Sequence, residues 1–394
     1  MNSMHTLILG GGFGGLAVAN ALRAELPAEN AITVVDAAER FHVGAGKTWL
    51  MLGERTFEQI SQARAALLDP GIRLVEARID AIDLASGHVK AGDDELTWDY
   101  LVVALGADLD MTAVPGLADA AHAFYTVEGA ERLAAELERF VEGDLVILIP
   151  KTPFKCPPAP YEAAMLIHSA LEARGLRDRV RMSVHTVEGA PMATAGPAMG
   201  AFIQDQLAAR GIAFHPKRAT AHVDGAARRV VFESGDEAPY DLLIAIPPHI
   251  APGVVRDAGL VDAWGWIPVD PHTLRVQSPS GAEGIYAIGD VTTLPLPGRF
   301  HPDARLVLPK AGVFAEAQGL VVADQIAAEV LGRAPRQAFD GRGYCYLETG
   351  ASRAVRAEGA FFELPHPVMA SGQPDEAQYQ DKLAWVERLL QPRG

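Results

Sequence analysis

The sequence predicts an α/β fold with two Rossmann-type nucleotide-binding domains and a small C-terminal α+β region. Three observations support this prediction. A glycine-rich turn joins the first strand to the first helix, a second strand–helix series follows in mid-chain, and two further apolar strands each end in a glycine. A chain of 394 residues is long enough for two or three domains and a large buried core.

The opening segment, TLILGGGFGGLAVANALRAE, is typical of a strand, a glycine turn and a helix. The turn carries the spacing G-x-G-x-x-G, and the residues that we assign to it are Gly10, Gly12, Phe13, Gly14 and Gly15. The first glycine permits a tight turn, the second lets the backbone approach a pyrophosphate, and the third lets the helix pack on the strand. Asp36 ends the next strand, AITVVD, where a carboxylate would accept the ribose hydroxyls. These features together predict a dinucleotide site.

Two later segments indicate which dinucleotide binds. WDYLVVALGAD contains Ala104 and ends its apolar run at Gly106, and GIYAIGDVT ends at Gly289 and Asp290, with a long helix expected from about 310 to 331. This three-part arrangement resembles the FAD domain of the two-dinucleotide-binding flavoproteins, the glutathione-reductase-like fold. The resemblance implies that Asp290 binds the ribityl chain of FAD; the alternative is an ordinary turn aspartate.

The order of these segments suggests how the chain is divided. We expect a first part of the FAD-binding domain over 1–118 and a second Rossmann-like domain over 119–240, where the helical pattern TVEGAERLAAELERF and the strands DLVILIP and RVRMSVHTVE lie. The second part of the FAD-binding domain is expected over 241–325. A small interface or electron-acceptor region is expected over 326–394.

Composition limits the classes of partner and compartment. The formal net charge of −16 argues against nucleic acid, since a phosphate backbone is bound by an excess of Lys and Arg. The first strand begins almost at once, and no run approaches the roughly 18 apolar residues of a membrane span. We therefore expect a cytoplasmic protein with at most peripheral membrane contact. Two cysteines are too few for a secreted disulfide framework, and no metal site is predicted.

The second strand–helix turn, KTPFKCPPAPYE, contains no glycine. Its prolines 153, 157, 158 and 160 lack the N–H donors that would bind a nucleotide pyrophosphate. The turn instead holds Cys156 beside Lys155, just before a helix. A helix N-terminus and a cation both favour thiolate over thiol, so we expect a reactive cysteine with a lowered pKa. The alternative is an inert buried cysteine.

The second cysteine, Cys345, lies in DGRGYCYLETG, where glycines indicate a bend before a strand. The segments PFKCPPAPYE, GIYAIGDVT, LPKAG, AEAQGLVVADQIA and GYCY occur in the order found in the sulfide:quinone oxidoreductase and flavocytochrome c sulfide dehydrogenase flavoproteins, which the whole chain resembles. The resemblance implies that Cys156 and Cys345 form a redox disulfide over the flavin. On its own sequence context, Cys345 is more typical of a core residue.

Two departures from this family affect the prediction. Many quinone-reducing members carry a third cysteine before the turn, and this chain has none. The stretch RFHVGAGKTWL lacks both the cysteine that attaches FAD in flavocytochrome c flavoproteins and a C-x4-C pair. We therefore expect non-covalent FAD and no disulfide reduction of the glutathione-reductase type.

Two further residues match family positions. Glu162 lies about one turn into the helix after Cys156, where the resemblance implies a general base; alternatively it only complements the helix dipole. Lys310 in LPKAG matches a lysine near the flavin ring, where a cation would stabilise reduced flavin; alternatively it is a surface lysine at a helix start.

The function that we predict is FAD-dependent oxidation of sulfide, or of a small persulfide or thiol, with electrons passed to a quinone or another acceptor. A type II NADH:quinone oxidoreductase and a non-catalytic flavin-bound sensor or scaffold are the alternatives. The terminal pattern YQDKLAWVERLL gives a helix with Tyr379, Leu383, Val386 and Leu390 on one face, suited equally to packing on the protein or touching a membrane. The sequence does not fix the oligomeric state, for which a homodimer is one option, and it does not choose between an electron-accepting protein and a quinone.

Overall fold

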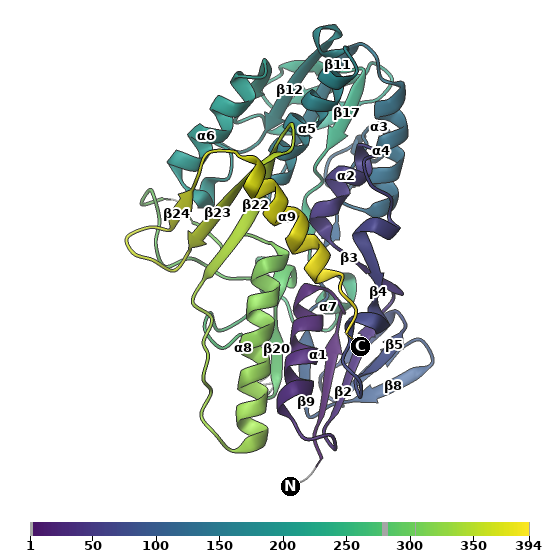
Figure 1. Cartoon of the computed structure of the whole chain (residues 1–394), viewed down its shortest axis with the longest axis vertical. Coiled ribbons are helices and arrows are strands. Elements are labelled where there is room, and N and C mark those ends of the chain that lie inside the picture. Colours follow the sequence, from purple (N-terminus) through teal and green to yellow (C-terminus); the bar gives the residue numbers. More distant parts are fainter. Residues whose placement is uncertain (1–2, 278–282, 304, 394) are drawn as a thin grey trace.

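The computed structural model describes residues 3–277, 283–303 and 305–393. Its main elements are two larger parallel sheets, smaller antiparallel sheets and the helices that pack around them (Figure 1). The helices are α1 (Phe13–Glu25), α2 (Lys47–Met51), α3 (Leu117–Ala120), α4 (Val127–Arg139), α5 (Ala159–Ala173), α6 (Pro197–Ala208), α7 (Gly253–Asp257), α8 (Gly312–Leu331) and α9 (Glu376–Leu389). The α/β class that the sequence predicts is confirmed.

The first parallel sheet has the strand order β20-β9-β1-β2-β5. Its strands are β1 (His5–Leu9), β2 (Ala31–Asp36), β5 (Arg73–Glu76), β9 (Tyr100–Val103) and β20 (Ile285–Ala287). The central strand, β1, is an apolar run that is buried on both faces, as expected for a parallel sheet covered by helices. The chain forms β20 only after it has built the second sheet. The glycine turn after β1 and the segment around Asp290 after β20 therefore lie at the carboxyl edge of the same sheet.

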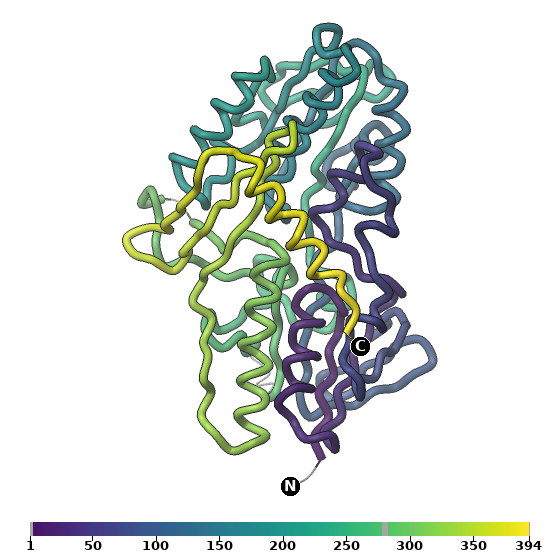
Figure 2. The backbone as a smooth tube through the Cα atoms, viewed as in Figure 1, coloured from purple at the N-terminus to yellow at the C-terminus, as the bar shows by residue number. Residues whose placement is uncertain are grey.

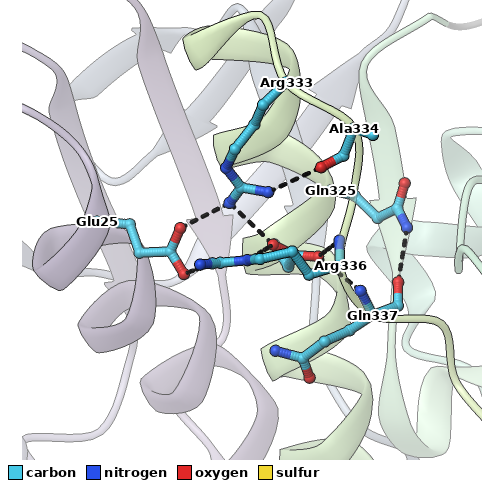
Figure 3. A network of polar contacts seen from close by, with 7 residues as sticks. Glu25, Gln325, Arg333, Ala334, Arg336 and Gln337 are labelled. Carbon is cyan, nitrogen blue, oxygen red and sulfur yellow. Dashed lines mark hydrogen bonds and ion pairs between the residues drawn. The ribbon is translucent and has the colours of Figure 1, made fainter.

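Helices α1 and α8 pack together beside this sheet and are joined by a charged network (Figures 1 and 3). Arg333 Nη2 lies 2.7 Å from Glu25 Oε2 and 2.8 Å from Asp324 Oδ1. Arg336 contacts both of the same carboxylates, and Asp324 is almost fully buried. Because each carboxylate has cationic partners, burial of Asp324 is compensated, and the network fixes the segment after α8 to the end of α1.

The second parallel sheet has the order β13-β12-β11-β17. Its strands are β11 (Gly143–Ile149), β12 (Val180–Thr186), β13 (Ile212–His215) and β17 (Leu242–Ala245). Helix α4 starts where the Thr126 side chain accepts a hydrogen bond from Gly129 N, and α5 follows the proline-rich turn after β11. Because β17 pairs with β11, we propose that the second domain ends just after this strand rather than at 240.

Several short strands form smaller sheets around the two parallel sheets. Three-stranded sheets are formed by β6 (Ile79–Asp83), β7 (His88–Ala91) and β8 (Asp94–Thr97), and by β14 (Thr220–Asp224), β15 (Arg229–Phe232) and β16 (Glu237–Pro239). Strand pairs are β3 (Arg40–His42) with β4 (Ser61–Ala63), β10 (Asp108–Leu109) with β18 (His249–Ile250), and β19 (Ile267–Pro268) with β21 (Thr292–Thr293).

The C-terminal region forms the antiparallel sheet β22 (Arg342–Gly350), β23 (Arg353–Ala360) and β24 (Val368–Ser371), and α9 packs on β22 and β23. Trp385 and Val386 of α9 are buried against the protein, and the end of the chain reaches the segment after β4, where Arg393 N donates to Ala66 O at 2.8 Å (Figure 2). Of the two arrangements that the sequence allowed for α9, packing on the protein itself is the one observed. Among the described residues, none of the helices is both long and apolar enough to cross a bilayer.

Candidate active site

A cavity of about 760 Å³ lies where the two parallel sheets and the C-terminal region meet, a volume in the range of small-molecule and cofactor sites. The predicted site residues that line it are Gly10, Gly12, Phe13, Gly14, Asp36, Ala104, Gly106, Cys156, Glu162, Gly289, Asp290, Lys310 and Cys345. Gly15 is the one predicted residue outside the lining. The structure therefore gathers the predicted thiols, the base candidate and the glycine motifs around one space.

The glycine turn shows two different reasons for its glycines. A Cβ added at Gly12 would meet nothing within 4 Å, so this position borders open space in the cavity. A Cβ at Gly15 would lie 1.8 Å from Gly10 O, so Gly15 permits the close packing of α1 against the turn. These are the separate tasks that the motif predicts, namely access to a pyrophosphate and helix–strand packing.

Arg64 is a cavity residue that sequence analysis missed. Its guanidinium Nε donates to Gly11 O at 2.9 Å, and its Nη2 lies 3.2 Å from Asp36 Oδ2. Asp36 also accepts from Gly11 N at 2.7 Å. Arg64 Nη1 is buried without a hydrogen-bond partner among the described residues, and Arg64 lines the cavity. A buried guanidinium N–H without a partner is costly, so it indicates that a polar group belongs in this part of the cavity.

Cys156 adopts a left-handed backbone conformation with φ of 53°, uncommon for a residue other than glycine. Its backbone N–H donates to Lys310 O at 2.7 Å. This bond joins the turn over residues 151–162, called the cysteine turn below, to the segment before α8. Cys345 lies inside β22 opposite Ala357, not at the bend that the sequence suggested. Both cysteines are free thiols, and both are partly exposed to the cavity.

The predicted lowering of the Cys156 pKa is wrong. Burial, and then the nearby Glu162 carboxyl, raise the pKa of Cys156 to about 12. Burial, and then Cys156 and Glu162, likewise raise the pKa of Cys345 to about 12. The cations that oppose this at Cys156 are Lys382 and Lys47 rather than the adjacent Lys155. Desolvation outweighs these cations, so the thiol form is favoured.

Glu162, in the first turn of α5, is buried in a cluster with one lysine and a second carboxylate. Lys382 Nζ donates to Glu162 Oε1 at 2.8 Å and also contacts Glu348 Oε1. Burial raises the pKa of Glu162 to about 7; Lys382 lowers it and Glu348 raises it further. Burial lowers the pKa of Lys382, but its two carboxylate partners outweigh burial and raise it. Two carboxylates sharing one cation favour a carboxyl that takes up and releases a proton near pH 7.

Lys382 and Glu348 were not identified from the sequence. Lys382 lies three residues after Tyr379 and four before Val386, on the face of α9 that was expected to be apolar. Its side chain is fully buried, with Nζ 4.9 Å from the centre of the Trp49 ring. A lysine on an apolar helix face was a usable signal, because such a charge needs a buried partner.

Lys310 is buried rather than on the surface. Its ammonium donates to the carbonyl oxygens of Asp290 at 2.6 Å and Thr292 at 2.7 Å, and it lies 3.4 Å from the centre of the Trp266 ring. Burial lowers its pKa to about 7. Burial and the charge of Lys155 also lower to about 7 the pKa of Lys47, another cavity residue that sequence analysis missed. The cavity thus contains two lysines that change charge near neutral pH.

The carboxyl end of β12 contrasts with that of β2. Glu188 follows β12 where a ribose-binding acid would stand in a second nucleotide site, as Asp36 ends β2. Tyr161 Oη, from the first turn of α5, donates to Glu188 Oε2 at 2.6 Å, and Thr186 Oγ1 donates to the same oxygen at 3.2 Å. Glu188 Oε2 therefore already accepts two hydrogen bonds from side chains of its own domain, and one of them comes from the helix that follows the proline turn.

Comparison with known proteins agrees with this geometry. A family model described as pyridine nucleotide-disulphide oxidoreductase matches residues 4–319, and the chain belongs to this family. The chain is 26% identical over 378 residues to the mitochondrial sulfide:quinone oxidoreductase of Mus musculus, covering 92% of this chain and 80% of that protein. The resemblance to sulfide:quinone oxidoreductases is thus confirmed by relatives that span most of the chain.

Solved structures show the same fold. The sulfide:quinone oxidoreductase from Aquifex aeolicus superimposes with a TM-score of 0.84 at 23% identity, covering 98% of this chain and 90% of that one. NDH2 from Plasmodium falciparum in complex with NADH superimposes with a TM-score of 0.75 at 13% identity, covering 99% and 95%. The glutathione-reductase-like fold that the sequence predicts is confirmed.

FAD is the cofactor that this family binds, and the residues present fit it. Open space beside Gly12 suits a pyrophosphate, and Asp36 ends β2, where an acid would accept ribose hydroxyls. Arg64 Nη1, which has no partner among the described residues, could donate to a polar group of the cofactor. Asp290, Lys310 and Lys47 line the same cavity, where they would face the flavin end of the cofactor.

Proposed function

We propose that this protein oxidises sulfide with FAD through a redox pair formed by Cys156 and Cys345, and passes the electrons to a quinone. The observation that carries the proposal is that the chain's two cysteines, far apart in sequence, line the cavity that also holds the flavin glycine turn. Sulfide:quinone oxidoreductases are among the relatives that span most of the chain. The Cys156–Cys345 disulfide is part of this proposal, since the thiols are free in the structure.

The proposed sulfur step balances within the cysteine pair. Hydrosulfide attacks one sulfur of the Cys156–Cys345 disulfide, a sulfur–sulfur bond forms to that cysteine, and the bond between the cysteines breaks. The products are a persulfide on one cysteine and a thiolate on the other. The incoming sulfur is oxidised by two electrons, and the disulfide is reduced by the same two.

Cavity side chains supply the proton and charge handling. Glu162, with a pKa raised by burial to about 7, accepts the proton of hydrogen sulfide or of the persulfide. Lys310 is held by the Asp290 and Thr292 carbonyls. In its protonated form, which predominates below about pH 7, it would stabilise anionic sulfur and reduced flavin. FAD, bound without a covalent link, would supply the two-electron carrier between the cysteine pair and the acceptor.

The acceptor site that we propose is an aromatic wall of the same cavity. Phe13 and Trp385 stack with ring centres 6.3 Å apart, and Tyr346 lies 5.9 Å from Trp385. All three line the cavity, and Tyr344 adds a further ring. A flat apolar quinone suits such a wall, and its lipid solubility favours peripheral contact of the protein with a membrane. A cytoplasmic location and a homodimer stay predictions from the sequence.

A type II NADH:quinone oxidoreductase is the second candidate, because NDH2 shares the fold. The Tyr161–Glu188 contact and the proline turn argue against it. Anaerobic addition of either reductant to the purified yellow protein separates the candidates. We expect sulfide to bleach the flavin absorbance and NADH to leave it nearly unchanged. Bleaching by NADH alone would select the second candidate, and no bleaching by either would select a flavin-bound sensor.

A separate measurement tests how FAD is attached. Precipitation with acid should release all of the yellow colour into the supernatant, because RFHVGAGKTWL contains no attachment cysteine. Flavin retained in the pellet would contradict a non-covalent cofactor.

A further inference from the structure

A tyrosine in the wall of the cavity that holds both cysteines has a buried hydroxyl with no partner among the described residues. Tyr125 immediately precedes Thr126, the residue that caps α4. Its side chain is buried and lines the cavity, and its Oη has no hydrogen-bond partner among the described residues. Leaving a buried hydroxyl unpaired costs about 1–3 kcal/mol. The hydroxyl therefore indicates a hydrogen-bond acceptor that forms in the cavity during the reaction.

The ring of Tyr125 is held in place by its neighbours. Phe124 lies 5.1 Å away between ring centres, and His249 packs edge-on at 5.2 Å. His249 is itself fixed, because its Nδ1 lies 3.0 Å from Pro247 O and its N–H donates to Pro153 O at 2.8 Å. Pro153 belongs to the cysteine turn, so the residues that orient Tyr125 are connected to the segment that orients Cys156.

Cys156 is the acceptor that best fits this hydroxyl. After burial, Cys156 and then Glu162 are the largest causes that raise the pKa of Tyr125 well above its usual value. Tyr125 therefore keeps its proton and can donate it in a hydrogen bond. The Glu162 carboxylate already has Lys382 as a partner. At Cys156 the backbone N–H of Ala159 is the one hydrogen bond that favours the thiolate among the described residues, so the sulfur anion has room for a second donor.

We propose that Tyr125 Oη donates a hydrogen bond to the sulfur anion that forms on Cys156, either its thiolate or the terminal sulfur of its persulfide. The inference rests on the proposed function only in treating Cys156 as the reacting thiol. No proton is transferred: the hydroxyl keeps its hydrogen and stabilises the anion in a buried position where Glu162 disfavours it. Tyr125 would thus supply at this cysteine the stabilisation that the adjacent Lys155 does not.

The test measures the reactivity of Cys156 without using sulfide. In the FAD-loaded Cys345→Ser protein, Cys156 is the remaining cysteine, and its modification by methyl methanethiosulfonate at pH 8 can be followed by mass spectrometry. Because only the thiolate reacts, adding Tyr125→Phe should slow modification about tenfold, equivalent to a rise of about one unit in the thiol pKa. The ring remains, so FAD affinity should change by less than about twofold.

Tyr161→Phe is the matched control. It removes a second buried tyrosine hydroxyl near the same helix start, but that hydroxyl already donates to Glu188. We expect this variant to leave the Cys156 modification rate unchanged, even if it lowers the melting temperature. An equal slowing in both variants would show a general loss of packing and would overturn the proposal.

Two other outcomes are informative. Weaker FAD binding in Tyr125→Phe with an unchanged modification rate would assign the hydroxyl to the cofactor and overturn the proposal. If modification slows as expected in a protein that sulfide does not reduce, the hydrogen bond is supported while the proposed sulfide oxidation fails. The two hypotheses therefore fail separately.

Discussion

The strand–turn–helix units that begin with β1 and β11 have the same order of elements, but their turns carry residues of different chemistry. The first turn has open space beside Gly12, and next to it Arg64 has a buried N–H with no partner among the described residues. Asp36 lines the same cavity. The second turn has four prolines and a cysteine with positive φ. Tyr161, just after this turn, donates a hydrogen bond to Glu188, the acid that follows β12. Under the proposed function, the first unit presents amide groups to a diphosphate, and the second unit, with the same order of elements, presents a thiol to a redox partner.

The largest effect is expected from the cysteines of the second turn and of β22. Cys156→Ser and Cys345→Ser should each abolish flavin reduction by sulfide, because a disulfide needs both sulfurs. The double variant should lose no more than either single one, since residues that act as a unit are not additive. FAD content and melting temperature are the controls, and we expect both to be retained. Normal reduction of Cys345→Ser by sulfide would leave Cys345 as a core residue and contradict the disulfide.

Glu162 gives the next largest effect and a pH signature. Its pKa is raised to about 7, so its carboxylate form is present above pH 7 and is lost as the pH falls below this value. Glu162→Gln should therefore be slower than the native protein by about 100-fold at pH 8.5 and nearly equal to it at pH 5.5. Taking the ratio of the two rates at each pH cancels the ionisation of sulfide itself. A ratio that does not vary with pH would mean that Glu162 only supports the structure.

The first turn can be tested with two alanines that separate binding from folding. A Cβ at Gly12 meets no protein atom, so Gly12→Ala should keep the melting temperature of the FAD-free protein and weaken FAD binding by about tenfold or more. A Cβ at Gly15 meets Gly10 O at 1.8 Å, so Gly15→Ala should lower the melting temperature as well. Titration of FAD into each variant, with thermal melts, checks the pair. Equal FAD affinity in Gly12→Ala and the native protein would move the pyrophosphate elsewhere.

The sequence predicted the features that depend on local order and missed those that depend on packing. Gly12, Asp36, Cys156 and Glu162 were found because each has a fixed place relative to a strand end or a helix start. The pKa of Cys156 was predicted with the wrong sign, because neighbouring residues reveal a helix N-terminus but not the burial that other segments impose.

Several residues of the candidate site lay outside recognisable motifs. Arg64 reaches Asp36 from a short segment with no pattern of its own, and Glu348 and Lys382 come from the last 50 or so residues of the chain. These residues reach the site because segments that are far apart in the sequence pack together in the fold. A pattern within one segment does not reveal such packing. Of these three residues, Lys382 alone could have been found from the sequence, because it is a charge on an apolar helix face.

The smallest effects are expected from Glu348 and Lys382, which act on the Glu162 pKa from opposite directions. Glu348 raises this pKa and Lys382 lowers it. Glu348→Gln should therefore move the pH dependence of sulfide-driven reduction to lower pH, and Lys382→Met should move it to higher pH, each by about one unit. Lys382→Met also leaves two buried carboxylates without their cation, so its free energy of unfolding should fall by about 3–5 kcal/mol, whereas Glu348→Gln keeps a one-to-one pair. Stopped-flow reduction between pH 5.5 and 9, well below each variant's melting temperature, checks both shifts. Opposite shifts would show that β22 and α9 together set the proton affinity of Glu162. Shifts of the same sign would contradict this and indicate a general change in the shape of the cavity.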